Sequence, residues 1–200
     1  VTGGTACLTG GTVAGPAASW AALTATGTRF GQTLDVTAGT TTLNDATVAR
    51  NVAVSGAATT FGATGTVFGG TLDVSGGTVA LTGTSVAGAT TLTGGTTTTS
   101  NIVAGGGITT TAPATLNAGG TLVGAVTNGG TMNVAGALTQ TGTTANSGTL
   151  IVGAAGDFRT GGLTNTGTAT NAGSATGDVT NAAGGTLTTT GTLNGALTSA

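Results

Sequence analysis

Residues 69–82 read Gly-Gly-Thr-Leu-Asp-Val-Ser-Gly-Gly-Thr-Val-Ala-Leu-Thr and predict two short strands around a Gly-Gly corner. Leu72 and Val74 alternate with polar residues before the corner, and Val79 and Leu81 alternate with polar or small residues after it. Because successive side chains of a strand face opposite sides, this period of two gives each strand one apolar face. The stretch therefore predicts β-strands that each bury one face away from water.

Variants of this phrase recur along the chain at a nearly constant interval. Val36, Val54 and Val74 end equivalent phrases that lie 18 and 20 residues apart, and Met132 and Leu150 repeat the interval of 18. In the second half, an asparagine precedes many of the glycine-rich corners, which suits a corner because Asn tolerates left-handed backbone angles and Gly adopts them at little cost. The asparagines concerned are Asn117, Asn128, Asn146 and Asn181.

This repeat predicts an all-β fold, a parallel β-helix or β-solenoid with about 18–20 residues in each coil. Two or three short strands and their corners fill a coil of that length. The alternative is an antiparallel meander or sandwich, since Gly-Gly also forms two-residue hairpin turns. In-register parallel neighbours 18–20 residues apart would decide for the solenoid.

The regular phrases begin near Thr33, so the sequence divides into an irregular start, residues 1–32, and solenoid repeats, residues 33–200. Pro16 and the Ala-rich run at residues 17–23 interrupt the pattern and indicate first coils with a helical turn or a loop around Trp20. The Trp20 ring either covers apolar surface or contacts a partner. Repeats continue almost to both ends, so we expect either that the chain is a piece of a longer rod or that its ends stack on other copies.

The amino-acid composition argues against catalysis and against metal binding. The chain has 41 Gly and 53 Thr among 200 residues and contains no His, Lys, Glu or Tyr. Acid–base or nucleophilic catalysis needs a base near neutral pKa with an orienting partner, and a zinc site needs clustered Cys or His. We therefore predict no enzyme, no catalytic, cofactor-binding or metal-binding residues, no cofactor and no small-molecule substrate.

The few ionisable groups are scattered. Asp35 and Asp73 are predicted at the same outward position two coils apart, as parts of a solvated face. Three Arg make no basic face, so a nucleic-acid partner is not expected. Cys7 is the single cysteine, and it is either an incidental small residue or a link to another chain.

The phrases at residues 70–82, 121–130 and 177–187 resemble the passenger and stalk regions of bacterial autotransporter and filamentous-haemagglutinin-type adhesins. The resemblance covers roughly residues 33–200. It implies a right-handed parallel β-helix, secretion to the extracellular side or bacterial outer surface, and a role in adhesion, aggregation or stalk formation.

The leading hypothesis is a structural or adhesive fibre segment whose partner is another copy of itself or the surface of a host or neighbouring cell. Low charge favours lateral contact, because few like charges oppose it. The alternative is a recognition module that binds a ligand or an ice lattice through stacked Thr faces. Candidate Thr pairs are Thr141 and Thr143, Thr164 and Thr166, and Thr188 and Thr190.

Overall fold

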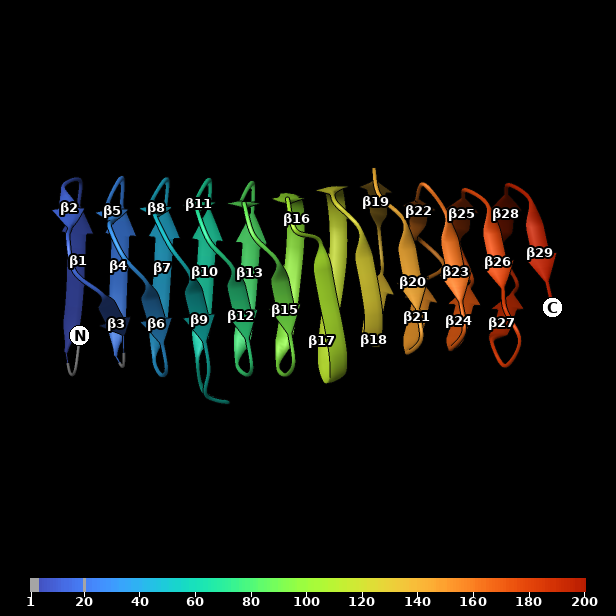
Figure 1. Cartoon of the computed structure of the whole chain (residues 1–200), viewed down its shortest axis with the longest axis horizontal. Coiled ribbons are helices and arrows are strands. Elements are labelled where there is room, and N and C mark those ends of the chain that lie inside the picture. Colours follow the sequence, from blue (N-terminus) through green and yellow to red (C-terminus); the bar gives the residue numbers. More distant parts are fainter. Residues whose placement is uncertain (1–3, 20) are drawn as a thin grey trace.

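The computed structural model describes residues 4–19 and 21–200, and the strands in these ranges form one parallel β-solenoid of about 11 turns. Figure 1 shows the turns stacked side by side into a rod, with the two ends of the chain at opposite ends. Every strand pairing is parallel, as in β10 (Thr60–Thr64) with β13 (Thr78–Thr82). The solenoid prediction is therefore confirmed, and the antiparallel alternative is wrong.

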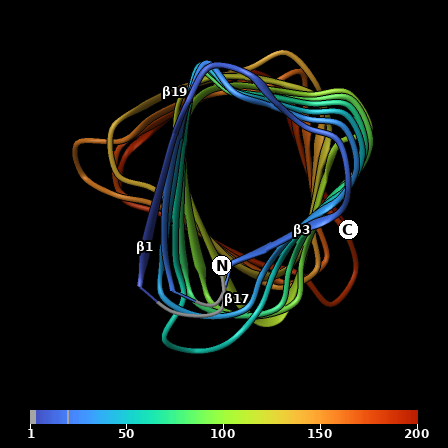
Figure 2. The same cartoon turned by 90° about the vertical axis from the view of Figure 1, so that its left-hand side faces the viewer.

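The coil is right-handed. Figure 2 looks along the rod from its N-terminal end, and the chain turns clockwise from β1 (Thr5–Thr9) through β2 (Thr12–Val13) to β3 (Ala17–Ser19) as it recedes. This is the hand that nearly all parallel crossover connections adopt. No helix in the described part of the chain is long and apolar enough to cross a membrane.

Each turn has three sides, which we call the first, second and third face in chain order. The first face carries the longest regular strands, and the long strands β16, β17 and β18 each continue around a corner. The first face is formed by β1, β4 (Ala22–Thr26), β7 (Thr40–Asn44), β10, β13, the start of β16 (Thr96–Ala104), the middle of β17 (Ile108–Val123), the end of β18 (Val126–Val134), β21 (Thr149–Val152), β24 (Thr168–Asn171) and β27 (Thr186–Thr189).

The other two faces are narrower. The second face is formed by β2, β5 (Arg29–Phe30), β8 (Thr47–Val48), β11 (Val67–Phe68), β14 (Ser85–Val86), the ends of β16 and β17, β19 (Ala137–Gln140), β22 (Asp157–Arg159), β25 (Ser174–Thr176) and β28 (Thr192–Asn194). The third face is formed by β3, β6 (Leu34–Val36), β9 (Val52–Val54), β12 (Leu72–Val74), β15 (Thr90–Leu92), the starts of β17 and β18, β20 (Thr144–Asn146), β23 (Leu163–Asn165), β26 (Val179–Asn181) and β29 (Leu197–Ser199).

The register explains the sequence interval. Thr78 pairs with Thr60 and with Thr96, and each partner lies 18 residues away. Longer coils place the extra residues in corner loops. The turn from Thr40 to Thr60 spans 20 residues and contains the exposed segment 56–58, which Figure 1 shows hanging below the rod after β9.

The core is a thin column of inward side chains that stack on their counterparts one coil away. Leu72, Val74, Val79 and Leu81 are all buried, as their alternation predicts. All four Phe of the chain are also buried inside the column, and the rings of Phe61 and Phe68 lie 6.2 Å apart between centroids. Because apolar side chains stack on apolar side chains at equivalent positions, each turn covers the buried face of its neighbour.

The start of the chain already forms coils. Strands β1 to β5 lie within residues 5–30, and β3 and β4 pair with β6 and β7 of the following turn. The segment Ala17–Ser19 of the Ala-rich run is strand β3 rather than a helical turn. Trp20, around which a loop was expected, lies outside the described residues.

The corner between the third and first faces depends on glycine. Gly39, Gly77 and Gly95 occupy it in three turns with φ of 72°, 78° and 71°, a region that L residues with side chains rarely adopt. A Cβ on Gly95 would also overlap the carbonyl group of Gly77 in the preceding turn. That carbonyl accepts a hydrogen bond of 2.9 Å from the amide of Thr96, so the two backbones cannot separate without losing it.

We expect Gly95→Ala to lower the free energy of unfolding by at least about 2 kcal/mol, because left-handed strain and the backbone overlap add. Gly62→Ala is the matched control, because Gly62 points outward from β10, has ordinary φ and would place its Cβ in open space. This control should be neutral or stabilising by about 0.5 kcal/mol. Urea denaturation followed by circular dichroism measures both, and equal effects would contradict the corner's role.

Candidate functional site

The most regular feature of the surface is a file of nine threonines along the first face. They occupy the first outward position of nine consecutive turns, and the register pairs each with the next. The file consists of Thr40, Thr60, Thr78, Thr96, Thr115, Thr131, Thr149, Thr168 and Thr186. All nine are exposed or half-buried, and the spacing along the rod is that of neighbouring strands, about 4.8 Å.

The next outward column of the same face is mixed. It runs through Thr42, Gly62, Ala80 and Thr98 and then changes to amides, with Asn133 donating a 2.9 Å hydrogen bond to Asn117 of the preceding turn; Ile151 follows, 39% exposed. The threonine hydroxyls therefore repeat at a regular spacing along the rod, but the outward residues beside them, across the strands, vary in type. Such a face can make hydrogen bonds and close van der Waals contacts, but it offers no acid or base.

Charged side chains lie elsewhere. Asp35 and Asp73 point outward from β6 and β12 on the third face, with Ala53 between them in register. They are thus two coils apart at the same position, as predicted. Asp157 and Arg159 form an ion pair of 3.0 Å on the second face, and both side chains are substantially exposed.

The threonine pairs predicted from the sequence do not form one surface. Thr164 points outward from β23 on the third face, whereas Thr188 points outward from β27 on the first. Thr141 and Thr143 lie in the corner between β19 and β20. Choosing Thr-x-Thr pairs by local spacing therefore missed the file. A Thr directly after a glycine occupies seven of its nine positions, all except Thr60 and Thr115, and this was a partial signal in the sequence.

The hollows on this surface are shallow and uncharged. One of about 650 Å³ lies over the corner between the third and first faces and is lined by Ser75, Thr78, Thr93, Thr96, Pro113 and neighbouring Gly and Ala residues. No group of three or more Cys, Asp, Glu or His that could hold a metal ion occurs in residues 4–19 and 21–200. Cys7 is exposed on the first face with a free thiol.

An asparagine column inside the rod was missed by the sequence analysis. Asn128, Asn146, Asn165 and Asn181 are buried at the last inward position of the third face, and each of the first three donates a 2.7 Å hydrogen bond from its Nδ2 to the Oδ1 of the next. The corner asparagines do not use the left-handed angles that Asn tolerates, since only Asp45 and Asn101 have positive φ among the described non-glycine residues. The spacing of 16–19 residues between inward asparagines was the available signal.

The side-chain amides of these asparagines also bond to backbone carbonyls in and beyond the corner that follows the third face. The Nδ2 of Asn146 contacts the carbonyl oxygens of Gly148 at 3.3 Å and of Thr168 at 3.0 Å. Asn165 repeats both contacts one turn later, with Gly167 and Thr186. These amides bond to one another and to backbone carbonyls, and the Oδ1 of Asn128, at the end of the column, is the atom left without a partner. The asparagines therefore act mainly as internal structural contacts.

The middle of the rod contains a second group of buried polar side chains. The hydroxyls of Thr90, Thr97, Thr99 and Thr110, in adjacent turns, are buried and have no hydrogen-bond partner within the protein. Such groups weaken a core, because their lost contacts with water are not replaced. These four hydroxyls therefore do not contribute hydrogen bonds to the column.

Comparison with known proteins assigns neither a family nor a related structure. No family model matches the sequence, no curated protein matches it, and no solved structure matches the model.

We expect Asn146→Ala to lower the free energy of unfolding by about 2–4 kcal/mol, because it leaves the amides of Asn128 and Asn165 each short of one buried partner. Asn133→Ala is the control, since Asn133 points outward and makes one exchangeable side-chain contact; its cost should stay below about 1 kcal/mol. Thermal and urea midpoints measure both. Equal losses would show that the buried column adds nothing to the rod.

Proposed function

We propose that this chain is a structural and adhesive segment of an extracellular fibre or stalk at a bacterial surface, without enzymatic activity. Its partners are copies of itself or the surface of a host or neighbouring cell. The observation that carries the proposal is the uninterrupted stack of about 11 similar turns. At the strand spacing of about 4.8 Å, they make a rod about 50 Å long.

The surface supports the same role. The net charge is −2 over 200 residues, and the outward side chains are mainly threonine, alanine and glycine. Few like charges oppose the approach of a second rod or of a cell surface. A stalk needs a stable, repetitive shape more than it needs a pocket, and the hollows are shallow and uncharged.

The proposal predicts that cells displaying the chain aggregate and settle faster than cells displaying a core-disrupted variant. Leu72→Asp is a suitable control, because Leu72 is fully buried and a carboxylate there breaks the core while barely changing the composition. Settling should change less than about twofold between low and high salt, because the interaction involves few charges. Equal settling by both displays, or a steep salt dependence, would contradict the proposal.

A second function, recognition of an ordered surface such as an ice lattice, is favoured by the nine-threonine file alone. Its hydroxyls repeat at one spacing over nine turns. Lattice matching in two dimensions also needs regularity across the strands, and the neighbouring column changes from Thr to Gly, Ala, Asn and Ile. The structural role is therefore preferred.

Lattice recognition predicts thermal hysteresis by the purified chain, with growing ice crystals becoming faceted. Thr131→Lys should reduce this effect, because a long charged side chain would stand above the file, whereas Thr180→Lys on the third face should not. A nanolitre osmometer measures the freezing gap. A chain without hysteresis would remove this second function and leave the structural role intact.

A further inference from the structure

We propose that the first face is a docking surface for a second copy of this chain, so that two rods lie side by side through their longest strands. This rests on the self-association proposed above and names the surface that carries it. The first face differs from the other two in its charge, its shape and its area.

All eight charged residues of the chain lie away from the outward positions of the first face. Three are on the second face, two are on the third, and three are in the corners; they are Arg29, Asp157 and Arg159, then Asp35 and Asp73, then Asp45, Arg50 and Asp178. Removing water from an unpaired charge is costly, and charged residues are depleted at the centre of protein interfaces. The first face can therefore be covered without burying an unpaired charge.

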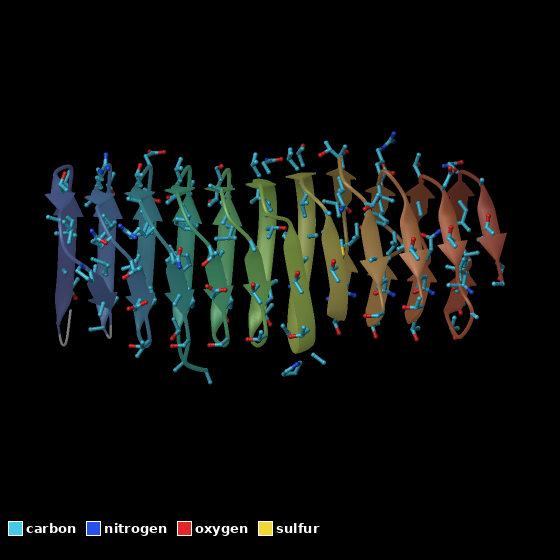
Figure 3. The ribbon with its side chains drawn as sticks, in the orientation of Figure 1. Atoms are coloured by element: carbon cyan, nitrogen blue, oxygen red, sulfur yellow. The ribbon has the colours of Figure 1, made fainter. Side chains whose placement is uncertain are left out.

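The outward side chains of this face are also short. They are almost all Thr, Ser, Asn, Ala or Gly in the described part of the chain. Short side chains are found all along the rod in Figure 3, which is viewed with the third face in front. Side chains of this size present a nearly flat surface. Facing β sheets of small and β-branched residues pack closely, since identical side chains in successive strands interdigitate.

The area matches what a specific pair requires. In the C-terminal half, loops drawn in orange project beyond the outline on the side of β1, so the smooth part runs over eight strands from β1 to β18. Eight strands at about 4.8 Å and five residues at about 3.3 Å give about 600 Å² on each partner. A pair would bury about 1,200 Å², the lower end of the range for specific interfaces, which indicates a reversible dimer.

The other faces are less suitable for a second copy. On the second face, the strands of the first five turns have only two residues, and Arg29 and Arg159 project from it. On the third face, most strands have three residues, and Asp35 and Asp73 project from neighbouring parts of it. Covering the third face would remove the carboxylates of Asp35 and Asp73 from water, which opposes association there.

The test compares two double variants of the full chain by sedimentation velocity from about 10 µM to about 1 mM. Thr78→Lys with Thr115→Lys places two cations on the first face, two turns apart. Thr91→Lys with Thr127→Lys places the same cations on the third face, also two turns apart. Circular dichroism and thermal midpoints establish that both variants keep the solenoid.

We expect the unchanged chain to form a concentration-dependent dimer, the first-face variant to dimerise at least about tenfold more weakly, and the third-face variant to stay within about twofold. Equal weakening by both variants, or weakening by the third-face variant alone, would overturn the assignment of the first face while leaving self-association in place. A chain that stays monomeric at the highest concentration would overturn the docking proposal. If cells displaying it also fail to aggregate, the proposed function fails with it.

Discussion

The structure depends on the backbone hydrogen bonds that join each turn to the next in parallel register. Thr78, for example, donates from its amide to the carbonyl of Thr59, and Thr96 donates to Gly77 one turn later. Because these bonds fix equivalent residues above one another, every inward position becomes a column and every outward position becomes a file. The hydrophobic core, the asparagine column and the threonine file are three results of that one register. Glycine at the corner permits it, because a side chain there would separate the backbones.

The composition of the chain follows from the same constraint. A narrow coil leaves little room inside, so the column holds mainly Val, Leu and Ala, with Phe in a few turns. Where apolar residues give way to Asn in the second half, the amides bond to one another along the column and to the corner carbonyls. A polar group is therefore accepted inside the rod when its counterpart in the next turn can pair with it. The unpaired hydroxyls of Thr97 and Thr99 mark where that condition is not met.

Much of the fold could be predicted from the sequence, because alternation and interval are both visible in it. Leu72, Val74, Val79 and Leu81 were assigned inward, and Asp35 and Asp73 were placed on equivalent positions two turns apart. The faces were harder to predict, because coil length varies with the corner loops and a fixed period loses register. The threonine file follows true register through coils of 16 to 20 residues, so counting from Thr141 or Thr164 could not recover it. The inward asparagines were misread because Asn is common at corners for a different reason.

The orientation of the hydrogen bonds has a mechanical consequence for a stalk. The bonds between turns run along the rod, so a pull on its two ends loads them in series, one turn after another, rather than sharing the force among them. In such an arrangement the weakest junction sets the strength of the whole, since each turn is held only by its neighbours. The turns that contain Thr90, Thr97, Thr99 and Thr110 have the poorest polar pairing inside the column. These four hydroxyls add no polar contact between turns, so at these junctions the tension is carried by the backbone ladder and the apolar column.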